Sequence, residues 1–279
     1  MTNPGLQKLT QRMDAANSLV CVGLDSQLEK LPAHLKGHPY PQFAFNQAII
    51  DATHEYVCAY KPNIAFYEAQ GEKGLTELKM TMDYLRLNHP EVFTICDAKR
   101  GDIGSTNVGY VQEIFDWLGF NAVTLHPYLG REAIQPFLDR KDKVSIILCR
   151  TSNPGSPELQ DLLVDGQPLW SVVAKKVAAN WNGNQNCMLV VGATYPEEMS
   201  LVRQLVPEMT FLVPGIGAQG GDLQATVAAG LDAQKKGVVI NSARAIIFAS
   251  QKEDFAEMAG REAKKLRDQI QTFIEENSR

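Results

Sequence analysis

The chain contains the glycine-rich stretch Pro214-Gly215-Ile216-Gly217-Ala218-Gln219-Gly220-Gly221-Asp222, and its place along the sequence separates two α/β folds. It begins within the end of an apolar run at residues 210–217 that is typical of a strand, and it leads into a helical pattern. An open doubly wound sheet carries its Gly-x-Gly-x-x-Gly loop after the first strand, whereas barrels commonly have a phosphate site after the seventh. The first apolar run ends Val22-Gly23-Leu24-Asp25, without such a loop. This favours the barrel.

Short apolar runs rich in Val and Ile recur along the rest of the chain, with helical patterns between them. They lie at residues 18–25, 57–63, 92–99, 122–128, 144–151, 187–194 and 237–244. Most are almost continuously apolar, as parallel strands buried on both faces should be. We therefore predict an α/β protein, a single (β/α)8 TIM barrel, in preference to two domains. The barrel spans residues 1–279, with an N-terminal helix at about 4–17 and a C-terminal helix at about 253–274; helices are also predicted at 105–118 and 196–206.

Composition and charge narrow the function classes. The 279 residues are 44% apolar and 21% charged, which is ordinary globular composition and argues against disordered or fibrous classes. With 27 Lys plus Arg against 32 Asp plus Glu, the net charge is -5, so no basic footprint for nucleic acid or anionic membrane is present. No leader pattern or long apolar window is found. We expect a cytoplasmic protein with a small-molecule partner.

Cysteine and histidine patterns argue against a metal centre. The five cysteines are odd in number, form no Cys-x-x-Cys pair and lie inside apolar runs, so we expect buried free thiols: Cys21, Cys58, Cys96, Cys149 and Cys187. The five histidines form no spacing such as His-Glu-x-x-His. We expect no metal.

Charged residues gather where the first three predicted strands end. Asp25 ends the first, Lys61 the second, and Asp97, Lys99 and Asp102 follow one another at the third. Active sites of such barrels lie at the carboxyl ends of strands, and pleating predicts Asp97 and Lys99 on one side with Lys61 ~5 Å away. The alternative is a neutral salt-bridge network that only holds loops. A lysine kept charged by flanking carboxylates can stabilise a carbanion and deliver its proton.

Two further features suit a phosphorylated ligand. The glycine-rich turn at 214–222 lets backbone N–H groups converge on an anion at a helix N-terminus, and Arg244, taken to end the eighth strand, supplies a planar fork for the same phosphate. The segment from Thr151 to about residue 168 is long for a barrel connection. It is interpreted as a lid or binding loop, in which Ser152 and Asn153 face a base or amide edge; a tolerated surface insertion is the alternative.

Together these residues carry a family resemblance. The stretch Asp97-Ala98-Lys99-Arg100-Gly101-Asp102-Ile103-Gly104-Ser105-Thr106 resembles the signature of the orotidine 5'-phosphate decarboxylase family, in its longer bacterial form. Further stretches resemble the family in order, at residues 22–25, 60–63, 149–155, 214–222 and 241–244. The Asp-x-Lys-x-x-Asp core alone is shared with phosphosugar decarboxylases and synthases of related barrels.

The resemblance implies cofactor-independent decarboxylation of orotidine 5'-monophosphate to uridine 5'-monophosphate and CO2, the last step of UMP biosynthesis. It assigns Lys99 as proton donor to the ring carbanion, Asp97 as the group facing the departing carboxylate, Lys61 as a ribose contact with Asp25, and Asp102 as the residue that orders the charges. The implied substrate-binding residues are Asp25, Asn63, Thr106, Ser152, Gly217, Gln219 and Arg244.

Within that set, the resemblance has Ser152 reading the pyrimidine amide edge, and Gln219, Arg244 and the backbone near Gly217 binding phosphate. Asp102 and Thr106 are expected to reach the partner subunit's site, which implies a homodimer.

Two alternative functions stay open. A metal-dependent phosphosugar decarboxylase or aldolase-like synthase needs carboxylates where Mg²⁺ sits, and Lys61 argues against that. The second alternative is a non-catalytic phosphoribosyl-binding protein, and only an activity assay excludes it.

Overall fold

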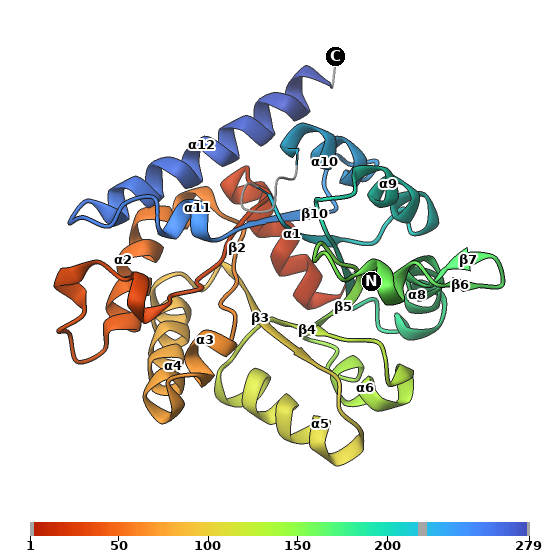
Figure 1. The fold of residues 1–279 in the computed structure, drawn as a ribbon, viewed down its shortest axis with the longest axis horizontal. Coiled ribbons are helices and arrows are strands. Elements are labelled where there is room, and N and C mark those ends of the chain that lie inside the picture. The colour runs from red at the N-terminus through yellow and green to blue at the C-terminus, as the bar shows by residue number, and fades with distance from the viewer. Residues whose placement is uncertain (1–2, 217–221, 278–279) are drawn as a thin grey trace. The chain divides into compact units, whose positions relative to one another are not determined.

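The computed structural model describes residues 3–216 and 222–277. Within them, eight strands form a closed barrel in the order β1-β10-β9-β8-β5-β4-β3-β2 (Figure 1). The barrel strands are β1 (Val20–Val22), β2 (Ala59–Tyr60), β3 (Phe93–Arg100), β4 (Ala122–Leu125), β5 (Val144–Arg150), β8 (Cys187–Val191), β9 (Phe211–Pro214) and β10 (Val238–Ser242). Neighbouring strands run parallel, as where Cys21 lies opposite Ala59. The predicted TIM barrel is confirmed, and each strand lies within one residue of a predicted run.

Helices connect the strands, as the alternating pattern predicts. They are α1 (Pro4–Ala16), α2 (Pro41–Thr53), α3 (Ala65–Glu68), α4 (Gly71–Asn88), α5 (Gly104–Val111), α6 (Gly130–Leu138), α7 (Pro157–Gln160), α8 (Leu169–Lys176), α9 (Pro196–Leu205), α10 (Leu223–Gly230), α11 (Arg244–Ile247) and α12 (Phe255–Glu276). The predicted helix at 105–118 is α5 followed by a π-helical stretch, Gln112–Trp117. No helix within the described residues is long and apolar enough to cross a membrane.

By its internal contacts the chain divides into two compact units. Unit 1 comprises residues 1–7, 99–112 and 122–240; unit 2 comprises residues 8–98, 113–121 and 241–279. In unit 2, α12 lies along α2 (Figure 1), and a side chain at Gly260 would meet the carbonyl oxygen of Ala52 at 2.7 Å. Phe45 of α2 stacks between Phe248 and Phe255, at centroid distances of 5.7 and 5.2 Å. These apolar contacts hold the helices that cover β1 and β2.

The five cysteines are free and buried, as predicted. Burial raises the pKa of the Cys21, Cys149 and Cys187 thiols to about 12, because a thiolate is poorly solvated in an apolar core. These thiols are therefore protonated and unreactive at neutral pH.

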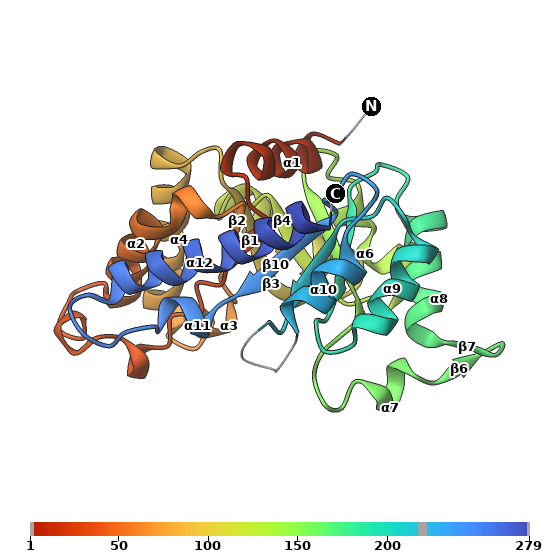
Figure 2. The same cartoon turned by 90° about the horizontal axis from the view of Figure 1, so that it is seen from above.

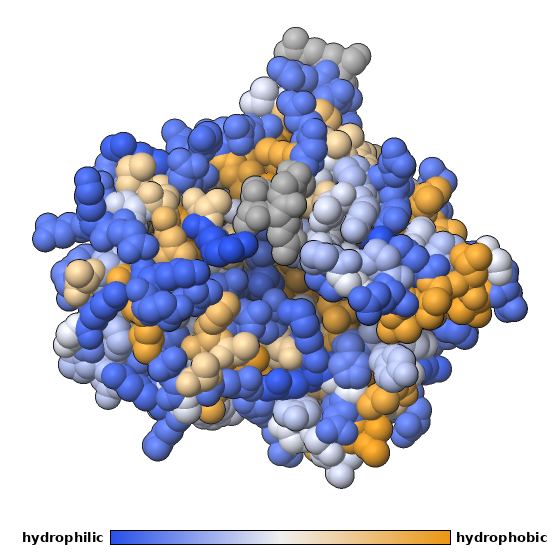
Figure 3. Space-filling view, viewed as in Figure 1, coloured by the Kyte–Doolittle hydropathy of each residue, from blue (hydrophilic) through white to orange (hydrophobic). Residues whose placement is uncertain are grey.

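The long segment after β5 has secondary structure of its own. Helix α7 is followed by a two-stranded antiparallel hairpin of β6 (Leu163–Val164) and β7 (Gln167–Pro168), which project beside α8 (Figure 2). Apolar side chains gather over this hairpin and α8 in the space-filling view (Figure 3), and Leu163 is 70% exposed. Exposed apolar side chains that cluster in this way are typical of surfaces that contact a ligand or a partner.

Candidate active site

A buried ion pair lies at the carboxyl ends of β2 and β3 in unit 2. Lys61 directly follows β2 and is 4% exposed, and its Nζ lies 3.1 Å from Oδ2 of Asp97. Burial by itself would lower the pKa of Lys61, but the charges of Asp97 and Asp25 outweigh it, so this pKa is raised. The Lys61 side chain is therefore an ammonium at neutral pH. Strand pleating predicts Lys61 close to Asp97, and the structure brings the two side chains together.

Asn63 connects the carboxylate of Asp25 to the Lys61–Asp97 ion pair. Its backbone N–H donates to Oδ1 of Asp25 at 3.2 Å, and its backbone pairs in parallel with that of Asp97. Its side-chain amide nitrogen lies 3.5 Å from Oδ2 of Asp97. Asp25, Lys61, Asn63 and Asp97 thus form one cluster that joins the ends of β1, β2 and β3.

Arg244 corrects one sequence prediction. It does not end a strand: β10 ends at Ser242, and Arg244 is the exposed first residue of α11. The chain here runs close to the end of β1, because Gly23 donates its N–H to the carbonyl of Ser242 at 2.9 Å. A Cβ on Gly23 would lie 2.5 Å from the Cβ of Ala243, so only glycine permits this approach.

Lys99 lies in unit 1, at the carboxyl end of β3, and its backbone is unusual. Its φ is +48°, in the left-handed region that residues other than Gly, Asn and Asp rarely adopt. The N–H of Lys99 donates to Oγ1 of Thr124 at 3.0 Å, which holds this conformation. Such strained positions cluster at functional sites. The break in the pleat also means that strand alternation does not set the direction of the exposed Lys99 side chain.

The loop that carries Asp102 is held from two sides. Gly101 has a φ of +154°, and a Cβ there would lie 2.7 Å from the ring of His126. The side chain of buried Asn107 donates to the carbonyl of Asp102, and also to that of Ala133 at 2.6 Å. The Asp102 side chain is exposed, as is Thr106 on the first turn of α5. Both side chains are accessible from outside this unit.

Ser152, half-buried and two residues beyond β5, lies against the end of β8. A Cβ on Gly192 would lie 2.8 Å from the Cβ of Ser152. Any residue other than glycine at position 192 would therefore push the two backbones apart. The N–H of Gly192 also donates to the carbonyl of Arg150 at 2.8 Å. The position of Ser152 is thereby set by its neighbours in the barrel.

The site residues predicted from the sequence divide between the two units. Unit 2 holds Asp25, Lys61, Asn63, Asp97 and Arg244, and unit 1 holds Lys99, Asp102, Thr106 and Ser152. Gly217 and Gln219 lie outside the described residues. Three residues that position the site are not predicted from the sequence: Thr124, Asn107 and Gly192. Each fits an ordinary strand or helix pattern, so nothing in the sequence marks it out. No cluster of His, Cys, Asp and Glu suited to a metal ion occurs within the described residues.

Comparison with known proteins assigns the chain to a family. The model of the "Orotidine 5'-phosphate decarboxylase / HUMPS family" matches residues 18–259. The chain belongs to this family. The decarboxylase family includes an orotidine 5'-phosphate decarboxylase of Cellvibrio japonicus, 49% identical over 95% of this chain and 97% of that protein. One of Janthinobacterium sp. is 47% identical over 96% of this chain and 98% of that protein.

A solved structure agrees with this family assignment. The structure of Leishmania donovani OMP decarboxylase superposes with a TM-score of 0.82 at 35% sequence identity. The match covers 96% of this chain and 99% of that one. The decarboxylase family's fold therefore extends over nearly the whole of this chain, and the sequence resemblance to its bacterial members is confirmed.

Proposed function

We propose that this chain decarboxylates orotidine 5'-monophosphate to uridine 5'-monophosphate and CO2 without a cofactor, with Lys99 as proton donor. The observation that carries the proposal is the enclosed Lys61–Asp97 ion pair at the carboxyl ends of two barrel strands. Orotidine 5'-phosphate decarboxylases align with nearly the whole chain at 47–49% identity, which makes it a carboxy-lyase of UMP biosynthesis. The residue roles that follow are part of the proposal.

The reaction needs positive charge beside the reacting carbon. When the bond to the carboxylate breaks, its electron pair stays on the ring carbon, in the plane of the ring and without a conjugated electron sink. An ammonium held next to that carbon stabilises the developing charge. The Lys99 ammonium then transfers its proton to the carbon, and the resulting amine regains a proton from water.

Lys61 and Asp97 prepare the site for this step. The raised pKa of Lys61 keeps this side chain positively charged beside Asp97. The Asp97 carboxyl group then faces the substrate carboxylate that is to leave. Asp102, reaching in from the second subunit of the dimer proposed below, orders these charges, and Lys61 with Asp25 holds the ribose.

The remaining site residues bind the two ends of the nucleotide. Ser152 reads the amide edge of the pyrimidine, and Asn63 supports the ribose end through Asp25. Arg244 is exposed, so its guanidinium is free to meet a phosphate from solvent, together with Gln219 and the backbone near Gly217. Contacts to a phosphate remote from the reacting carbon help to orient the substrate and lower the barrier.

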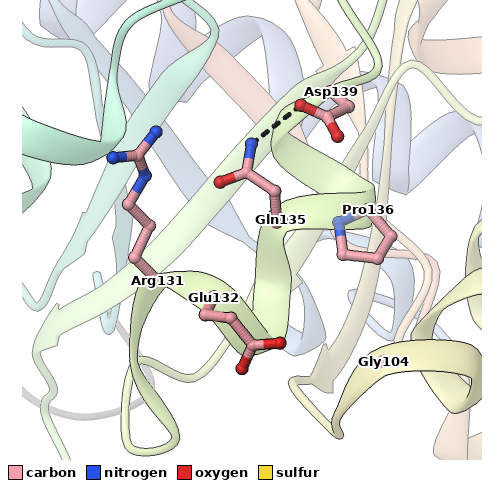
Figure 4. A pocket seen from close by; sticks show the side chains of 6 residues that line it. All are labelled: Gly104, Arg131, Glu132, Gln135, Pro136 and Asp139. Atoms are coloured by element: carbon pink, nitrogen blue, oxygen red, sulfur yellow. Dashed lines mark hydrogen bonds between the residues drawn. The ribbon is translucent and has the colours of Figure 1, made fainter.

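We propose that the protein acts as a homodimer in which Asp102 and Thr106 serve the partner subunit's site. Beside them, Ile103 and Val108 expose apolar side chains, with 59% and 45% exposure. A groove of about 550 Å³ lies between the start of α5 and α6, lined by charged Arg131 and Glu132 (Figure 4). An apolar patch bordered by charged side chains is typical of a protein interface.

We also propose two broader properties of the protein. One is that the chain is a single domain, because β3 and β10 each contribute residues to both compact units. The other is that the protein works in the cytoplasm, where its five free thiols would stay reduced.

The direct test of the function is loss of the ultraviolet absorbance of orotidine 5'-monophosphate after exhaustive treatment with a chelator. We expect full turnover, because ammonium groups supply the positive charge that a metal would provide. Turnover that disappears with the chelator and returns with Mg²⁺ would contradict the proposal and favour a metal-dependent phosphosugar enzyme.

A further inference from the structure

The end of β5 holds a buried arginine that the proposed chemistry does not use. Arg150 is 1% exposed, although a charged group is costly to remove from water unless it is paired and hydrogen-bonded. Its Nε donates to Glu198 on α9, and its Nη2 donates to the other carboxylate oxygen of Glu198 at 3.3 Å. The guanidinium also lies 4.3 Å from the ring centre of Tyr195. One side of Arg150 is therefore fixed to the start of α9.

The other side of the guanidinium holds the segment that follows Ser152. Nη1 of Arg150 donates to Oγ of buried Ser156 at 2.9 Å and lies 3.4 Å from both Oε1 of Gln160 and Oδ1 of Asp161. Gln160 in turn accepts from the N–H of Thr151 at 2.9 Å. Arg150 thus joins α9 to both ends of residues 151–161.

Ser152 lies within residues 151–161, and its backbone packs against Gly192. The carbonyl of Arg150 accepts from the N–H of Gly192, and the missing Cβ of Gly192 lets the Ser152 backbone approach. A guanidinium suits this task because its planar fork makes several directed hydrogen bonds at once, which an ammonium cannot reproduce.

From these contacts we infer that Arg150 is a positioning residue, which holds Ser152 where it can recognise the pyrimidine. Gly192 is the residue against which Ser152 packs. The inference rests on the proposed role of Ser152. It assigns Arg150 no contact with substrate: its effect passes through Ser156, Gln160 and Glu198.

The test compares Arg150→Lys with a matched control, Arg203→Lys. Arg203 is also an arginine of unit 1 stacked on an aromatic ring, 3.9 Å from the ring centre of Phe211. Its hydrogen bonds go to carbonyls before β9 and β10, including Met209 at 2.7 Å and Gly237 at 2.9 Å, at the amino ends of the strands. Both substitutions keep a positive charge and remove a fork, so both should lower Tm.

The readout is the dissociation constant for uridine 5'-monophosphate and for ribose 5-phosphate, which lacks the pyrimidine, together with kcat and KM. Arg150→Lys should weaken uridine 5'-monophosphate binding and raise KM by about tenfold, the scale of one hydrogen bond to the ligand. Its ribose 5-phosphate binding should stay within about twofold of wild type, and Arg203→Lys should change neither ligand's binding beyond that. Equal weakening of both ligands, or no weakening of either, would overturn the inference.

Two more variants keep the result decisive. If Arg150→Lys does not fold, Gly192→Ala should give the same selective loss, because its Cβ displaces Ser152; unchanged selectivity would again overturn the inference. Ser152→Ala tests the proposed role itself: with no selective loss, that role and this inference both fail. If Ser152→Ala is selective and Arg150→Lys is not, the inference alone fails. Wild-type turnover, measured alongside, reports on the proposed function independently.

Discussion

Nζ of Lys61 lies 3.1 Å from Oδ2 of Asp97, and the two side chains are only 5% and 12% exposed. Neither charge is well solvated, so each depends on the other. Breaking such a pair on one side leaves a buried charge without compensation, whereas removing both sides costs less. We therefore expect this pair to stabilise the structure around it, in addition to the part that we propose for it in the chemistry.

Substituting Lys61 by Met should lower the free energy of unfolding by ~3 kcal/mol, the scale expected when one partner of a buried ion pair is removed. Urea denaturation measures this. The double variant Lys61→Met with Asp97→Asn should be more stable than the sum of the single effects predicts. Strictly additive effects would mean that the two side chains are not coupled.

The same pair predicts how stability depends on pH. The folded-state pKa of Lys61 is raised above its ordinary value of 10.5, because the charges of Asp97 and Asp25 outweigh burial. Its contribution is therefore fully present below pH 10.5 and is lost as the pH rises above that value. The difference in free energy of unfolding between wild type and Lys61→Met should be constant from about pH 7 to 9 and shrink above about pH 10.5. A difference that grows above that pH would contradict the assignment.

Much of the barrel could be predicted because its strands are buried on both faces and read as apolar runs. The glycine-rich stretch after the seventh run then separated the barrel from an open sheet. The proximity of Lys61 to Asp97 is predicted by the pleating and the close spacing of neighbouring strands. These inferences depend on regular geometry, which residue spacing encodes.

Departures from regular geometry were harder to read. The hairpin of β6 and β7 turns at Asp165-Gly166, with φ values of +51° and +74°. This dipeptide is a known hairpin signal, within a segment whose length alone predicts a lid or binding loop. The left-handed backbone of Lys99 depends on Thr124, which is distant in sequence. The run at residues 237–244 predicts that Arg244 ends a strand, but β10 ends at Ser242 and the chain turns into α11.

The proposed shared site makes a prediction about mixed dimers. If Asp102 serves the partner while Lys99 serves its own subunit, the variants Lys99→Ala and Asp102→Ala should complement one another when refolded together. Random pairing gives half hybrids, and one of the two sites in each hybrid is intact, so about one quarter of wild-type activity should return.

Native mass spectrometry would confirm that hybrids form in this mixture. An activity no greater than the average of the two separate variants, with hybrids present, would rule out the shared site and leave the barrel unaffected.

The central claim is that Lys99 supplies the proton in a metal-independent decarboxylation, and turnover of orotidine 5'-monophosphate by Lys99→Ala tests it most directly. The variant should remain folded and still bind uridine 5'-monophosphate, because Lys99 is exposed and the ion pair of Lys61 with Asp97 is retained. Its kcat should fall by at least ~10³-fold, since both charge stabilisation and proton transfer are lost. Turnover within about tenfold of wild type would contradict the account.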